Sequence, residues 1–119
     1  MTAPAQRPVT RMSAEDLRRL ALALPETVEG AHHGRTDFRI GGRIFATLSP
    51  DGMEGVALLA PEEQAVLVAA EPAIFTPVPG GRGAKGATTI LIAAADEPTL
   101  RSALTLAWRR KAPKRLLKE

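Results

Sequence analysis

Residues 31–48 read AHHGRTDFRIGGRIFATL, and the second half of this stretch decides the fold. Two runs rich in apolar residues, TDFRI at 36–40 and RIFATL at 43–48, flank Gly41 and Gly42. Adjacent glycines between such runs indicate a tight hairpin, because glycine accepts the positive φ angles that a two-residue β turn requires. The stretch therefore predicts two antiparallel strands.

The pairing of these two strands has two registers, and the sequence leaves both open. A two-residue loop puts Ile40 opposite Arg43 and Phe38 opposite Phe45, with both phenylalanines on one face. A three-residue loop with a bulge shifts the pairing by one residue. Phe45 would then share an outer face with Arg39 and Arg43, a surface of cations and an aromatic ring that suits a nucleic acid.

The rest of the chain predicts helices and further strands on either side of this hairpin. The helices are expected from Ser13 to Pro25, from Pro61 to Pro72, and from Asp96 to about Arg110. Three further strands are expected within 27–33, 55–60 and 87–94, while the Pro/Gly-rich segment 76–86 predicts a loop. The fold class is therefore α+β: a two-layer domain with a largely antiparallel sheet of about five strands packed with about three helices.

The last predicted helix contains the single tryptophan of the chain. Leu100, Leu104 and Trp108 recur at intervals of four residues, which places them on one stripe of a helix. We therefore expect the Trp108 ring to be buried in the core, although a basic segment follows it.

The chain of 119 residues is long enough for one domain. We expect a flexible lead-in at 1–12, a single α+β domain at 13–112 and a basic tail at 113–119. The absence of cysteine excludes disulfides, thiolate metal sites and a cysteine nucleophile. No apolar run has membrane-spanning length and the N-terminus lacks a secretory signal, so a cytoplasmic protein without a membrane partner is expected.

Positive charge is concentrated near the C-terminus. Residues 109–119 carry six of the 16 Lys and Arg residues, but only one of the 13 acidic residues. A local cluster of this kind attracts phosphate groups.

The two adjacent histidines raise the question of an enzyme or a metal site. His32 and His33 would point to opposite faces of a strand, and no metal-binding spacing of histidines is present. Asp37 has a basic residue two positions away on each side, Arg35 and Arg39, and it could pair with either or orient a histidine. None of the three serines lies in a nucleophile motif. We therefore expect no enzyme activity, no metal and no cofactor.

Several segments of the chain resemble those of one known family. They are LPETVEGAHHGRTDFRIGGRIFATL at 24–48, PEEQAVLV at 61–68, ATTILI at 87–92 and LTLAWRRKAPKRL at 104–116. Together they resemble the MmcQ/YjbR family over about residues 13–116. The most specific blocks are F-R-[IV]-x-G-[KR]-[IL]-F-A at 38–46 and A-W-R-R at 107–110.

The resemblance implies a compact α+β domain whose antiparallel sheet is flanked by helices. It also implies DNA binding in a so-called double-wing arrangement, with no catalytic residue or cofactor to carry over. The sequence departs from the family pattern at Arg82, where many members have tryptophan. This difference removes a ring from the glycine-rich loop and adds a cation.

The leading interpretation is a small non-enzymatic domain that binds DNA through its phosphates. The alternative is a protein- or ligand-binding module with a fold like that of secretion chaperones. The expected partner is accordingly DNA or a protein. The candidate phosphate-binding residues are Arg39, Arg43, Arg82, Lys85, Arg109, Arg110, Lys111, Lys114 and Arg115.

Overall fold

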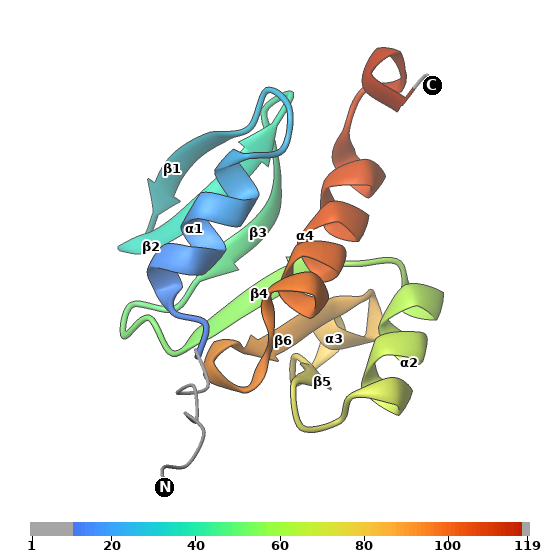
Figure 1. Ribbon diagram of the computed structural model, residues 1–119. Helices are drawn as coiled ribbons and strands as arrows, with labels where there is room; N and C mark the ends of the chain where they lie inside the picture. The colour runs from blue at the N-terminus through green and yellow to red at the C-terminus, as the bar shows by residue number, and fades with distance from the viewer. Residues whose placement is uncertain (1–10, 118–119) are drawn as a thin grey trace, which may run out of the picture.

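The computed structural model describes residues 11–117, in which a six-stranded antiparallel sheet has the order β1-β2-β3-β4-β6-β5 (Figure 1). The strands are β1 (Val28–His32), β2 (Arg35–Ile40), β3 (Arg43–Leu48), β4 (Glu54–Leu58), β5 (Phe75–Pro77) and β6 (Ala87–Leu91). The helices are α1 (Ala14–Leu22), α2 (Pro61–Ala70), α3 (Gly81–Ala84) and α4 (Glu97–Lys111). Two 3-10 turns, η1 (Ile92–Ala94) and η2 (Lys114–Leu117), complete the described chain, and the predicted α+β class is confirmed.

Helices α1 and α4 lie together on one face of the sheet (Figure 1). Both begin where the sequence predicts, because Ser13 accepts a hydrogen bond from the Asp16 amide and Asp96 accepts one from the Thr99 amide. The β4 residues buried against these helices, Gly55 and Ala57, are small, and a Cβ at Gly55 would lie 2.6 Å from Leu17 of α1. Val56 and Leu58 therefore point to the opposite face of β4, where they are half-buried.

The hairpin combines parts of both predicted registers. Ile40 pairs with Arg43, as a two-residue Gly41-Gly42 loop requires, but a bulge follows and Phe38 pairs with Ala46 instead of Phe45. The extra residue lets Phe45 and Ala46 both be fully buried although they are adjacent. The outer surface of Phe45 with Arg39 and Arg43, which the second of the two open registers would give, is therefore not formed.

Trp108 is buried, with 5% of its surface exposed, as predicted. Its indole Nε1 donates a hydrogen bond to the carbonyl oxygen of Pro25, at 3.0 Å. The ring thus fixes the end of α4 to the turn that follows α1, in addition to filling the core.

The structure differs from the sequence prediction in the segment 76–86. The short edge strand β5 and the four-residue helix α3 lie where a loop was expected. Pro77 is compatible with this position, since an edge strand leaves backbone amides unpaired.

Both ends of the described chain contact the core. Met12, placed in the flexible lead-in by the sequence, is 8% exposed and belongs to the core, while residues 1–10 of that lead-in lie outside the described part. Leu116 and Leu117 of the predicted basic tail pack half-buried against the core. Across residues 11–117, no helix has the length and apolar character needed to cross a membrane.

Candidate nucleic-acid interface

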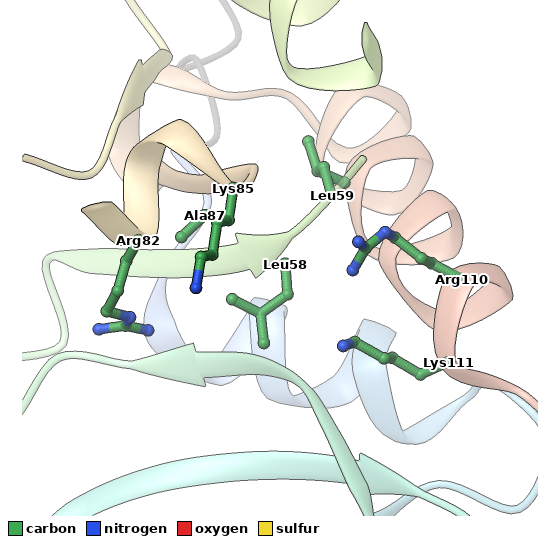
Figure 2. A pocket seen from close by; sticks show the side chains of 7 residues that line it. All are labelled: Leu58, Leu59, Arg82, Lys85, Ala87, Arg110 and Lys111. Carbon is green, nitrogen blue, oxygen red and sulfur yellow. The ribbon is translucent and has the colours of Figure 1, made fainter. Parts of the chain in front are cut away.

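Four of the predicted phosphate-binding residues line one cavity of about 290 Å³. Arg82 and Lys85 come from the α3 segment, and Arg110 and Lys111 from the last turn of α4. Figure 2 shows Lys85 on one side and Arg110 and Lys111 on the other reaching toward Leu58, whereas the Arg82 guanidinium is turned away from it at the rim. Leu58, Leu59 and Ala87 are the apolar part of the lining. We call this cavity the basic pocket.

The basic pocket lacks compensating negative charge. No carboxylate is among its lining residues, and within residues 11–117 none of its four cations forms an ion pair. Burial lowers the pKa of Lys111 below its ordinary value, and the nearby charges of Arg110 and Arg43 lower it further. Folding therefore disfavours the charged form of Lys111 relative to the unfolded chain, and a bound anion would offset that cost.

Two glycines hold α3 close enough to β4 to form this pocket. A Cβ at Gly83 would lie 1.7 Å from the carbonyl oxygen of Val78, and a Cβ at Gly86 would lie 1.9 Å from that of Leu59. Gly86 also has φ at +111°, which L side chains rarely adopt. The glycine-rich segment thus positions Arg82 and Lys85 through backbone contact.

We expect Gly86→Ala to lower the free energy of unfolding by about 2 kcal/mol, through backbone strain and displacement of α3. The matched control is Gly34→Ala, because Gly34 also has positive φ, at +74°, but no heavy atom lies within 4 Å of the added Cβ. The control is expected to lose only about 1 kcal/mol. Urea unfolding measures both losses, and equal losses would show that the close approach to Leu59 is unimportant.

The other predicted residues have different surroundings. Arg39 donates two hydrogen bonds to Asp37, and Arg115 donates two to Glu26, so both cations are already paired. Arg43 lies close enough to Lys111 for its charge to act there. Arg109 and Lys114 are exposed and do not line the basic pocket.

A second cavity, of about 250 Å³, lies on the face of the sheet that points away from α1 and α4. Thr47, Val56 and Thr89 pair across neighbouring strands and form its floor. His32, Arg35 and Arg82 also line it, together with Ser49, Glu54 and Val78. We call this cavity the polar pocket, and Arg82 belongs to both pockets.

Asp37 connects the strands beside the polar pocket. Its carboxylate is completely buried, and its partners are Arg39, at 2.8 and 3.0 Å, and Nδ1 of His32, at 2.7 Å. The hydrogen bonds from Arg39 hold the pKa of Asp37 below its ordinary value and, with the contact from His32, outweigh the opposing effect of burial. Asp37 therefore pairs with Arg39 and orients His32, two of the arrangements that the sequence left open.

The sequence missed Arg35 as a pocket residue, and no local pattern distinguishes it from other strand arginines. A metal site has no support from the geometry, because residues 11–117 contain no group of three or more His, Asp or Glu side chains that could hold an ion.

Comparison with known proteins places this fold in a family. The chain resembles the crystal structure of Deinococcus radiodurans protein DR2400, which carries the family-model domain DUF419, with a TM-score of 0.68 and 19% sequence identity. The likeness covers 82% of this chain and 77% of that one, and it supports the fold alone. No curated protein matches the chain. The family model YjbR matches residues 22–110, most of the chain, and the protein therefore belongs to the YjbR family.

Proposed function

We propose that this protein is a non-enzymatic domain that binds DNA through its phosphate backbone, with the basic pocket as the principal contact. The observation that supports this is the convergence of Arg82, Lys85, Arg110 and Lys111 on one cavity without a carboxylate in its lining. Lys and Arg contacts to phosphate release counterions from DNA and supply affinity that does not depend on base sequence.

The placement of these cations favours backbone contact over reading of bases. They come from two segments far apart in the sequence. Helix α3 has only four residues, and the pocket cations of α4 lie in its last turn, so neither set forms a row of base-reading side chains along a recognition helix. Arg43 extends the positive charge beyond Lys111 toward the β2–β3 hairpin. A track of phosphates running past the pocket and this hairpin would satisfy all five cations.

A salt titration of duplex binding tests the proposal. The probe is a short DNA duplex with hydroxyl groups at both ends. Its affinity for the protein is measured by fluorescence anisotropy from about 50 to about 200 mM salt. With four pocket cations engaged, we expect log Kobs to fall with log salt at a slope of about −3 to −4. Undetectable binding at low salt, or binding insensitive to salt, would contradict the proposal.

The alternative function, protein binding, is favoured by one groove. Val66, Leu67 and Leu106 line an apolar cavity of about 380 Å³ between α2 and α4, and Val66 is 66% exposed. Glu62 and Glu63 also line it, so its charge suits a peptide with basic residues beside apolar ones and disfavours DNA. This alternative would be favoured by a protein partner that binds the chain one to one. Val66→Glu should abolish binding of that partner, and Arg110→Gln should leave it unchanged.

A further inference from the structure

The polar pocket contains an imidazole whose orientation is built into the sheet. The buried carboxylate of Asp37 is held ionised by Arg39 and contacts Nδ1 of His32 at 2.7 Å. A carboxylate accepts hydrogen bonds, so Nδ1 carries the ring proton and Nε2 is the nitrogen left for a ligand. His32 itself lines the polar pocket and is 38% exposed at its side chain.

Gly30 leaves space for the side chains of Asp37 and Arg39. A Cβ at Gly30 would lie 3.0 Å from Oδ1 of Asp37 and 3.3 Å from Nε of Arg39. The buried Asp37–Arg39 pair therefore depends on the missing side chain at position 30. Replacing a buried ion pair by apolar side chains often leaves a protein equally stable or more stable. We therefore attribute the Asp37–Arg39 pair to its effect on His32, which Asp37 orients.

The charged residues that line the pocket with His32 are two cations, Arg35 and Arg82, and one carboxylate, Glu54. Within residues 11–117, Arg82 has no ion pair, and the only side-chain hydrogen bond of Arg35 is a long one, 3.5 Å, to the carbonyl oxygen of Leu48. Asp51 lies close enough to feel the charge of Arg35. Two guanidinium groups thus line a small cavity with hydroxyl groups on its floor, which suits a compact, multiply charged oxyanion.

We propose that the polar pocket binds the terminal phosphate monoester of a nucleic-acid strand, paired with Arg35 and Arg82 and contacted by Nε2 of His32. This assignment rests on the proposed function, because Arg82 is shared with the basic pocket and the strand bound there would lead into the polar pocket. Internal phosphodiesters carry one charge and no proton. A monoester has a second pKa of about 6, so near neutral pH it is mostly a dianion, with one more charge for Arg35 and Arg82 than a diester offers. The dianion is in exchange with a monoanion whose proton Nε2 can accept.

Oligonucleotides that differ only at their ends test the inference. Single strands of one sequence are prepared with a 5′-phosphate, a 3′-phosphate or hydroxyl groups at both ends, and their affinities are compared at fixed salt. We expect one phosphorylated form to bind about ten-fold more tightly, a difference of about 1.4 kcal/mol. Arg35→Gln should remove this increment, whereas Arg101→Gln should keep it, since Arg101 pairs with Glu97 on α4 away from the pocket.

The outcomes separate the two proposals. Equal binding of all three oligonucleotides, or binding of the duplex but of none of the three strands, would overturn the terminal-phosphate site and leave the DNA-binding proposal intact. Binding of neither the strands nor the duplex would overturn both. Inorganic phosphate that binds as tightly as the phosphorylated strand would overturn the assignment to a strand end. An increment that Arg35→Gln retains would also overturn the site.

A spectroscopic readout covers the case in which Arg35→Gln fails to fold. The His33 ring lies outside the lining of the polar pocket but only 5.7 Å from the His32 ring, so the control is the same oligonucleotide with hydroxyl groups at both ends. On addition of the phosphorylated oligonucleotide, and not of the hydroxyl-ended one, we expect the imidazole resonances of His32 to shift, and by more than those of His33. An unshifted His32 at saturation would contradict the inference.

Discussion

Trp108→Ala is expected to lower the free energy of unfolding by about 3–5 kcal/mol, the range for large aromatic side chains removed from cores. The ring is 5% exposed and lies in the core with the buried α4 residues Leu100, Ala103, Leu104 and Ala107. Truncation would leave a cavity and would also remove the hydrogen bond from Nε1 to the carbonyl oxygen of Pro25. Urea unfolding followed by circular dichroism measures the loss.

The neighbouring Arg109→Ala is the control, because Arg109 is exposed on the same turn and should change stability by less than about 0.5 kcal/mol. Tryptophan fluorescence of the wild-type protein gives an independent check. We expect blue-shifted emission that is poorly quenched by iodide. A Trp108→Ala loss no larger than that of the control, or a red and easily quenched emission, would mean that the ring is not a core anchor.

Arg39→Met is expected to cost about 3 kcal/mol at neutral pH, the lower end of the range for a broken buried ion pair. The lower end applies because the Arg39 side chain is 35% exposed while the Asp37 carboxylate is completely buried. The substitution leaves Asp37 with His32 as its remaining side-chain partner among residues 11–117. The matched control is Arg18→Met, whose partners Glu15 and Glu29 are both part-exposed, and its expected loss is below about 1 kcal/mol.

The pH dependence of this loss has a defined sign. The pKa of Asp37 is lower in the folded chain than in the unfolded chain, so its ionised form stabilises the wild-type protein above the unfolded pKa. That contribution disappears as the pH falls through the folded pKa. The difference in stability between wild type and Arg39→Met should therefore shrink in acid, below about pH 4. If the difference in stability between wild type and Arg39→Met stayed constant down to about pH 2, the pairing of Arg39 with Asp37 would be contradicted.

Much of the fold can be predicted because its signals are local. Gly41-Gly42 indicates the hairpin, and Ser13 and Asp96 mark the starts of α1 and α4 through their capping hydrogen bonds. The sequence offered a register with a bulge and one without, and it could not choose between them, because burying both Phe45 and Ala46 depends on how the helices pack. The short helix α3 was missed for a similar reason: its glycines are used for close contact with Val78 and Leu59, whereas in sequence they read as a loop.

The candidate site shows the same limit. Sequence identifies the cations, and it does not show that Arg82 and Lys85 meet Arg110 and Lys111 across β4 and β6. Nor does it show that Arg39 and Arg115 are already paired, since Glu26 lies 89 positions before Arg115. Tertiary contact therefore divides nine chemically similar residues into those free to bind an anion and those already engaged.

The comparison of Arg110→Gln with Arg109→Gln tests the central claim most directly. Both variants remove one positive charge from the same turn of α4, and only Arg110 lines the basic pocket. Salt titrations of duplex binding should show a slope smaller by about 0.9 in Arg110→Gln, the value for one lost phosphate contact, and an unchanged slope in Arg109→Gln. Equal effects of the two substitutions would contradict the claim, because binding would then follow the net charge of the C-terminal segment and not the pocket.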